Sequence, residues 1–275
     1  MRWLRFKFPG GKRASDRRIP TPVSHGRYRA LEKAIEQDAI GLRFQPQIEP
    51  RTGRIAGVEA LARWSKVESP EELFIRAEAS GLGERLSRAI QRKALRTAGA
   101  WDGPLAGLQL SINLLPRDLD RPGYEQWLLS EIAAAGLDPS RVTVEIVESS
   151  LLADPPAVAE RLERLRAAGV RVAIDDFGTG YSSLAYLTSL PLDTIKIDRA
   201  LITGLVGQRR DRIVVKAMIG LARELRLKVV VEGVESLAQL KILSDWGCDL
   251  YQGFLGAGAL TEEELAAFVD QRFAA

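Results

Sequence analysis

Residues 141–176 read RVTVEIVESSLLADPPAVAERLERLRAAGVRVAIDD. The runs at 141–147 and 171–176 are rich in Val and Ile, which predicts strands with apolar residues on both faces. Residues 155–168 between them have the periodicity of a helix. A strand, a helix and a second strand in this order predict a parallel strand–helix–strand unit.

The same alternation continues in both directions from this unit. Towards the C-terminus we expect strands at 194–198, 228–233 and 250–255, with helices at 182–189, 208–225, 235–247 and 261–273. Thr261 and Glu264 have the spacing of a capping box at the start of the last helix. Towards the N-terminus we expect strands at 41–50, 53–64 and 107–114, with helices within 70–100 and near 123–135.

Eight such strands in roughly 250 residues predict an α/β fold, a TIM-like (β/α)8 barrel. The turn Arg51-Thr52-Gly53 is too short for a crossover helix, so we expect the first strand to run antiparallel to the rest. A doubly wound open sheet is the alternative architecture. It is disfavoured because no glycine fingerprint follows the first strand.

The composition limits the chemistry available to this chain. Its 275 residues are 46% hydrophobic and 27% charged, as in a soluble globular protein. One histidine (His25) and one cysteine (Cys248) exclude a Cys/His zinc site and a Ser-His-Asp triad in the core. Cys248 lies in an apolar stretch and cannot form an internal disulfide, which favours a reducing, cytoplasmic location.

Charge is distributed unevenly along the chain. Residues 1–30 hold nine basic residues and one acidic residue, whereas the remainder holds 30 basic and 35 acidic residues. Prolines and glycines interrupt the basic segment, so we predict a flexible tail over 1–27 and one folded domain over 28–275. Aromatic residues in the tail could contact an anionic membrane surface. We expect no nucleic-acid partner, because the domain itself is net acidic.

Every predicted strand carries one polar residue at or near its end. In chain order these are Gln45, Glu59, Asn113, Glu145, Asp175, Lys196, Glu232 and Gln252. Buried polar groups cost free energy unless they have partners. Their recurrence on every strand indicates that they converge at the carboxyl mouth, where barrel enzymes carry their catalytic residues.

The residue types at this mouth indicate a metal site. Asp176 adds a fifth carboxylate to the four acids of the set, and Lys196 is the one cation among them. Oxygen ligands without sulfur or imidazole favour Mg²⁺ or Mn²⁺. Five carboxylates exceed what one ion needs, so we predict two metal ions that hydrolyse a phosphoester.

Seven motifs then resemble the EAL domain, a family of phosphodiesterases that linearise cyclic di-GMP. They are VEALARW (58–64), SINLLP (111–116), VEIVES (144–149), IDDFGTGYSSL (174–184), IKIDR (195–199), VEGVE (231–235) and YQGF (251–254). The resemblance covers about residues 28–265. It implies metal-dependent hydrolysis of cyclic di-GMP to linear pGpG by a water activated by two metals, in a protein that forms a homodimer.

The resemblance also assigns roles to individual residues. It implies one metal on Glu59, Asn113, Glu145 and Asp175, and a second on Asp175, Asp176 and Glu232, with Gln252 nearby. Lys196 resembles the lysine that orients the attacking water, so Glu59, Asp175, Lys196 and Glu232 are the implied catalytic residues. Gln45, Arg63 and Gln252 match positions that hold the substrate. Glu148 and Glu235 match residues that support the loop at 177–184.

Several of these roles have simpler alternatives. Glu148 and Glu235 could instead complement helix dipoles, Arg63 could be an exposed rim charge, and Lys196 could be an ion-pair partner alone. The sequence also departs from the family pattern after Trp64, where the loop is short and lacks His-Pro, and after Phe254, where LGAGALTEEE replaces the usual Ser-Arg-Pro. The alternative function is therefore a catalytically weak EAL domain that acts as a cyclic di-GMP receptor or a protein-interaction module.

Overall fold

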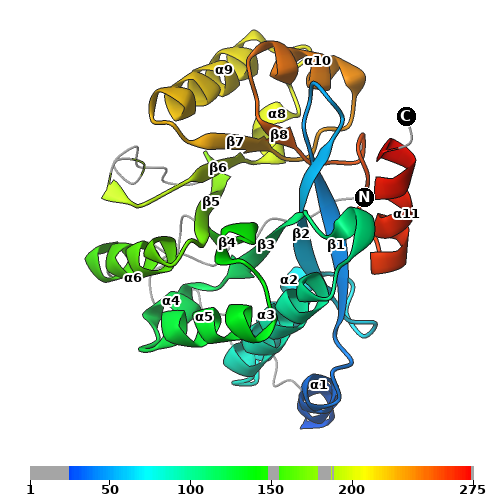
Figure 1. Ribbon diagram of the computed structural model, residues 1–275, viewed down its shortest axis with the longest axis vertical. Helices are drawn as coiled ribbons and strands as arrows, with labels where there is room; N and C mark the ends of the chain where they lie inside the picture. The colour runs from blue at the N-terminus through cyan, green and yellow to red at the C-terminus, as the bar shows by residue number, and fades with distance from the viewer. Residues whose placement is uncertain (1–24, 148–154, 179–186, 188, 274–275) are drawn as a thin grey trace, which may run out of the picture.

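The computed structural model describes residues 25–147, 155–178, 187 and 189–273. Within this part of the chain, strands β1 to β8 form one closed barrel in chain order (Figure 1). They are β1 (Gly41–Ile48), β2 (Ile55–Arg63), β3 (Gln109–Leu114), β4 (Val142–Val147), β5 (Arg171–Phe177), β6 (Thr194–Ile197), β7 (Lys228–Val231) and β8 (Leu250–Tyr251).

Helices surround the barrel, with α9 and α10 on one side of it and α3, α5 and α6 on another (Figure 1). The helices are α1 (His25–Glu36), α2 (Pro70–Ala79), α3 (Gly83–Gly99), α4 (Pro116–Asp120), α5 (Tyr124–Ala134), α6 (Pro155–Ala167), α8 (Arg199–Ile202), α9 (Arg209–Glu224), α10 (Leu237–Asp245) and α11 (Glu262–Phe273), with 3-10 turns at Gly103–Leu105 and Pro139–Arg141. The helix predicted at 182–189 falls almost entirely outside the described residues. No helix in the described ranges has the length and apolar character needed to span a membrane.

The predicted barrel and its antiparallel first strand are confirmed. β1 pairs antiparallel with both β2 and β8, and all the other neighbouring strands are parallel. Gly53 lies in the turn between β1 and β2 with φ of 73°, a conformation that favours glycine. The capping box is also confirmed, since Glu264 N–H donates to Thr261 Oγ1 (3.1 Å) and Thr261 N–H donates to Glu264 Oε2 (2.7 Å).

Two sequence predictions about the strands are wrong in detail. The last strand was predicted over 250–255 but ends at Tyr251. After it the chain turns, with Gly256 N–H donating to Gly253 O at 3.0 Å, and it passes so close to the segment after β7 that a Cβ on Gly253 would lie 2.3 Å from the Val234 backbone. Apolar residues on both faces were also predicted, but the inner faces of most strands carry polar residues, with Val230 and Leu250 among the apolar exceptions. On β4, Val144 and Ile146 belong to the core under the helices, whereas Glu145 points into the barrel towards β6.

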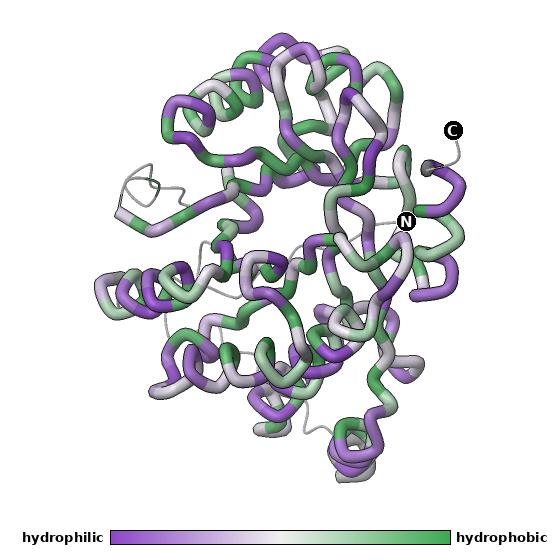
Figure 2. Tube along the Cα trace, in the orientation of Figure 1, coloured by the Kyte–Doolittle hydropathy of each residue, from purple (hydrophilic) through white to green (hydrophobic). Residues whose placement is uncertain are grey.

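The hydrophobic core lies mainly between the strands and the surrounding helices, and Figure 2 shows hydrophobic residues alternating with hydrophilic ones along these elements. A second cluster packs α1, α2 and α3 against the end of β2. Leu31 and Ala34 of α1 are buried there, while Glu32 and Glu36 pair with Arg85 of α3 at 2.8 and 3.0 Å. Helix α1 was not predicted from the sequence.

Candidate active site at the carboxyl mouth of the barrel

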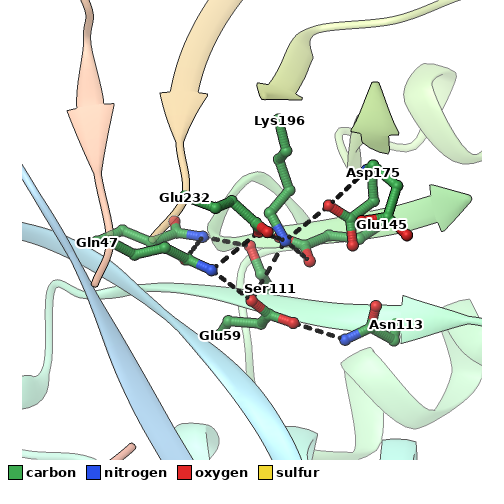
Figure 3. A network of polar contacts seen from close by, with 10 residues as sticks. Gln47, Glu59, Ser111, Asn113, Glu145, Asp175, Lys196 and Glu232 are labelled. Carbon is green, nitrogen blue, oxygen red and sulfur yellow. Dashed lines mark hydrogen bonds and ion pairs between the residues drawn. The ribbon is translucent and has the colours of Figure 1, made fainter. Parts of the chain in front are cut away.

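A buried lysine lies at the centre of the polar residues inside the barrel. Lys196 of β6 is 1% exposed, and its Nζ contacts carboxylates from four other segments (Figure 3). The distances are 2.6 Å to Glu145 Oε2, 2.8 Å to Glu232 Oε1, and 3.2 Å to both Glu59 Oε2 and Asp175 Oδ1. The structure therefore brings together residues separated by up to 173 positions in the sequence (Glu59 to Glu232).

Two amide side chains fix the position of Glu59. Asn113 Nδ2 donates to Glu59 Oε1 at 2.9 Å, and Gln252 Nε2 donates to Glu59 Oε2 at 2.9 Å. Gln252 also donates to Glu232 Oε1 at 3.0 Å. Burial raises the pKa of Glu59, but the Lys196 charge and these hydrogen bonds together outweigh it and lower the pKa overall.

The other carboxyl groups of the cluster have raised pKa values. Burial raises the pKa of Glu145 to about 8, with a further contribution from the neighbouring Glu59 charge. Burial and the adjacent Asp175 charge raise the pKa of Asp176 to about 7. Burial likewise raises the pKa of Glu232 well above its ordinary value. The Lys196 ammonium alone thus leaves these carboxyl groups short of positive charge.

Three of these acids are close enough to share one ion. Oxygen atoms of Asp175, Asp176 and Glu232 lie within 4.8 Å of one another. Asp176 has φ of 55°, in the left-handed region, which an aspartate tolerates better than most residues, and its N–H donates to Asp175 Oδ1 at 2.9 Å. Carboxylate oxygens that are short of positive charge fit a hard divalent cation such as Mg²⁺ or Mn²⁺.

A cleft of about 410 Å³ opens beside the cluster. Glu59, Asn113, Asp175 and Asp176 form one wall of this cleft, so an occupant can reach the carboxylates directly. Apolar residues that include Leu61, Phe74, Ile90 and Pro116 line other parts of it. A partly apolar cleft with convergent charged groups is the usual form of a small-molecule site.

The residues predicted to bind substrate lie at different distances from the cluster. Gln45 is partly buried and lies opposite Glu59 in the β1–β2 ladder. Gln252 is buried inside the cluster, where its amide is bonded to two carboxylates. Arg63, at the end of β2, donates to Ala62 O at 2.8 Å and lines a neighbouring hollow with Arg43.

The two residues predicted to support the loop lie away from the acid cluster or outside the described ranges. Glu148 and most of the loop at 177–184 fall outside the described residues. Glu235 precedes α10 and is largely exposed, and its Oε1 lies 3.8 Å from Arg199 Nη2. Ser236, rather than Glu235, caps α10, and its Oγ accepts from Gln239 N–H at 3.2 Å.

Two sets of buried polar residues around the cluster were not predicted from the sequence. Gln47 and Ser111 adjoin the cluster on the side where the parallel strands begin. Gln47 Nε2 lies 3.4 Å from both Ser111 Oγ and Gln252 Oε1 (Figure 3). Each lies two residues before or after a predicted residue on the same strand, so the alternation of strand side chains could have identified them. The second set surrounds Gln91 of α3, whose side chain has no such signal.

Gln91 connects the backbone of Asn113, beside the cluster, to a buried network of hydrogen bonds. Its Nε2 donates to Asn113 O at 3.0 Å and to Asp118 Oδ2 at 3.2 Å, and its Oε1 accepts from Tyr124 O–H at 2.9 Å. Ser87 O–H also donates to Asp118 Oδ2, at 2.6 Å. Burial raises the pKa of Asp118, although these hydrogen bonds oppose the shift. The network holds the backbone of β3 at the position of Asn113.

Comparison with known proteins gives one consistent family. The EAL domain family model matches residues 28–259. The chain is 34% identical over 279 residues to the cyclic di-GMP phosphodiesterase PA2567 of Pseudomonas aeruginosa, an alignment that covers 96% of this chain and 48% of the relative. The chain spans 28–48% of the length of four curated relatives that it matches.

Solved structures agree with this match. The phosphodiesterase MucR of Pseudomonas aeruginosa, solved as a complex with cyclic di-GMP, superposes with a TM-score of 0.80 at 36% identity, over 86% of this chain and 98% of that one. Klebsiella pneumoniae BlrP1, in a complex with manganese and cyclic di-GMP, gives a TM-score of 0.74 at 35% identity, over 80% of this chain and 56% of that one.

Proposed function

The chain belongs to the EAL domain family, and from that premise we propose that it hydrolyses cyclic di-GMP to linear pGpG with the help of divalent metal ions. The observation that carries the proposal is the contact of four buried carboxylates with Lys196 beside an open cleft. A barrel gains no stability from gathering acids in this way, because buried charges are costly unless they are balanced. Similarity to phosphodiesterases that carry cyclic di-GMP supports the choice of substrate.

The acids divide into two overlapping sets of ligands. One ion is assigned to Glu59, Asn113, Glu145 and Asp175, and a second to Asp175, Asp176 and Glu232, so that Asp175 is shared. Such ions, when bound, polarise a phosphoryl oxygen and lower the pKa of a water molecule. The manganese complex of the BlrP1 relative supports the same class of metal here.

The remaining residues hold the acids and the substrate. Lys196 keeps the carboxylates of four segments in one arrangement, and the resemblance to the family assigns it the orientation of the attacking water. Arg63 and Gln45 are assigned to the substrate at the edge of the cleft. In the reaction, the P–O bond to one ribose 3′ oxygen breaks and a P–O bond to the water oxygen forms. The water loses one proton and the 3′ oxygen gains one.

A chromatographic assay of the purified protein with cyclic di-GMP tests this function. We expect pGpG to accumulate with Mg²⁺ or Mn²⁺ and not with EDTA. No product with any divalent metal would overturn the hydrolase proposal. Binding of intact cyclic di-GMP under the same conditions would then identify the chain as a receptor. The homodimer remains a prediction from the resemblance, and light scattering on the same preparation tests it.

A further inference from the structure

A second cavity lies inside the barrel on the opposite side of the acid cluster. It has a volume of about 560 Å³ and opens where the parallel strands begin, beside Gln109, Arg171 and Lys228, the first residues of β3, β5 and β7. Glu145 lines its inner end, whereas Glu145 is not part of the wall of the carboxyl-side cleft. The two cavities therefore approach the acid cluster from opposite ends of the barrel.

This cavity exists because the inward-facing layers below the cluster include small residues. Side chains alternate along a strand, so the residues two positions below the cluster also point inward. Bulky branched side chains usually fill these layers in a TIM barrel. Here they include the small residues Ser111, Ala173 and Thr194, with Val230 and Leu250 as larger apolar members of the lining.

Part of the cavity wall is polar and able to form hydrogen bonds. Gln47, Ser111 and Thr194 line it and are all buried, between 3% and 8% exposed. Gln47 Nε2 and Ser111 Oγ are 3.4 Å apart, at the long end of hydrogen-bond distances. An apolar cavity would offer no hydrogen-bond partners to a polar molecule. This interior offers hydroxyl and amide groups that can bond to a hydroxylated molecule.

The mouth of the cavity is cationic. The five basic lining residues are Arg51, Arg54, Arg171, Arg223 and Lys228, against three carboxylates in the whole lining. Two of these three carboxylates already have partners at the mouth. Glu49 accepts from Arg54 and from Thr52 Oγ1, and Asp249 Oδ2 accepts from Val229 N–H at 2.8 Å. Arg171 Nη1 donates to the neutral amide oxygen of Gln109 at 3.0 Å, so its charge is available to an anion.

We propose that this cavity binds a pentose 5-phosphate group, carried by a sugar phosphate or by a nucleoside monophosphate, with the phosphate at the cationic mouth and the hydroxyl groups inside. Arginine side chains suit phosphate because their planar donors match its oxygens. A volume of about 560 Å³ lies in the range of small-molecule sites. This site is distinct from the carboxyl-side cleft, although Glu145 of the acid cluster lines its inner end, and the proposal does not rest on the proposed hydrolysis.

Isothermal titration calorimetry of the whole chain in EDTA tests the proposal, with inorganic phosphate, ribose 5-phosphate and AMP as the probes. We expect ribose 5-phosphate, AMP or both to bind at least tenfold more tightly than inorganic phosphate. The tighter of the two identifies the source of the group. If neither binds more tightly than inorganic phosphate, the polar interior does not recognise the pentose and the proposal is wrong.

Variants locate the binding. Arg171→Gln with Lys228→Gln removes two mouth charges and should weaken binding at least tenfold, whereas Arg85→Gln with Lys241→Gln removes two charges elsewhere and should leave it unchanged. Ala173→Leu places a larger side chain in the interior of the cavity and should also abolish binding. Circular dichroism checks that this variant folds. Binding that survives both cavity variants lies at another site and overturns the proposal.

Discussion

The Lys196 ammonium nitrogen lies 2.6 Å from Glu145 Oε2, and both side chains are 1% exposed. Burial alone would lower the pKa of Lys196, but Asp175, Glu145, Glu232 and Glu59 together raise it well above its ordinary value. The lysine is therefore charged at neutral pH. It serves as a permanent internal cation around which the acids of different strands are arranged.

Replacing this cation should destabilise the metal-free protein. For Lys196→Met we expect a loss of about 3–5 kcal/mol in the free energy of unfolding in EDTA, the usual cost of leaving a buried charge without its partner. Millimolar Mg²⁺ should restore part of this loss, and hydrolysis of cyclic di-GMP should be abolished. Urea unfolding with and without Mg²⁺ measures the first two effects.

Lys241→Met is the matched control, because Lys241 is exposed and pairs with Asp245, at 3.3 Å, on the same helix. Its free energy of unfolding should change by less than about 0.5 kcal/mol. Equal losses in the two variants would contradict the role of Lys196 as the cation of the cluster.

Metal binding should strengthen as the pH rises from 6 to 8. Protons held by Glu145, with a pKa of about 8, and by Asp176, with a pKa of about 7, must leave before a cation binds. Because these folded-state pKa values are raised above the ordinary 4.5 and 3.8, the stability contributed by the bound protons is fully present below these values. It is lost progressively as the pH rises, and the loss is complete above about 8 for Glu145 and about 7 for Asp176. Mn²⁺ should therefore raise the Tm more at pH 8 than at pH 6.

Calorimetry in two buffers of different ionisation enthalpy gives the direct readout of this coupling. Protons should be released on Mn²⁺ binding at pH 7, and Glu145→Gln should release fewer. Metal affinity that is the same at pH 6 and pH 8 would show that these carboxyl groups are not the ligands.

Much of this architecture follows from local patterns in the sequence. Alternation of strands with helices predicts the barrel, and the short turn at Gly53 predicts the antiparallel β1. Residues such as Glu59 and Glu232 could be placed at one mouth because parallel strands of a barrel end together. Helix α1 was not predicted, since its Leu31 and Ala34 are buried by packing against α2, α3 and the end of β2, which are distant in the sequence.

Other features depend on three-dimensional packing that no local pattern contains. Gln91 lies on a helix among charged residues, and its contact with Asn113 O exists only because α3 packs against β3. The polar interior below the cluster was also missed, because one polar residue near the end of each strand was considered, whereas Gln47 and Ser111 lie two positions away from Gln45 and Asn113. Whether an inward side chain meets another side chain or a cavity depends on the residues of the neighbouring strands.

Removing the charge of one proposed ligand should stop catalysis without unfolding the protein. Glu59→Gln keeps the shape of the side chain but not the negative charge that Lys196 and a metal require. Removing a residue that only hydrogen-bonds to a metal ligand typically costs about 10–100-fold in metal affinity or activity. Glu59 is proposed as a ligand itself, so we expect its replacement to lower activity by more than about 100-fold. Turnover of cyclic di-GMP at saturating Mn²⁺ is the measurement. Glu163→Gln, an exposed change on α6, should keep full activity.

The network behind Asn113 should contribute to both stability and activity. Gln91→Leu leaves Tyr124 O–H and Asn113 O without their side-chain partner, which we expect to cost about 1–3 kcal/mol in the free energy of unfolding. Gln126→Leu, on the exposed face of α5, should change it by less than about 0.5 kcal/mol. A Gln91→Leu protein with unchanged stability and unchanged Mn²⁺ affinity would show that the network does not position Asn113.

Arg63 should act on substrate binding rather than on the metal ions. Burial lowers the pKa of this guanidinium, and the nearby Arg43 charge lowers it further, so an anion placed between them would be stabilised. Both arginines line the hollow next to the cleft, and Arg43 already pairs with Glu264 at 2.9 Å, which leaves Arg63 as the better donor to a phosphate. For Arg63→Ala we expect KM for cyclic di-GMP to rise about tenfold, by about 1.4 kcal/mol, while Mn²⁺ affinity stays the same. Arg63→Lys should recover only part of the loss, because a lysine cannot donate two parallel hydrogen bonds. If kcat falls while KM is unchanged, Arg63 does not hold the substrate in its ground state and the assignment fails.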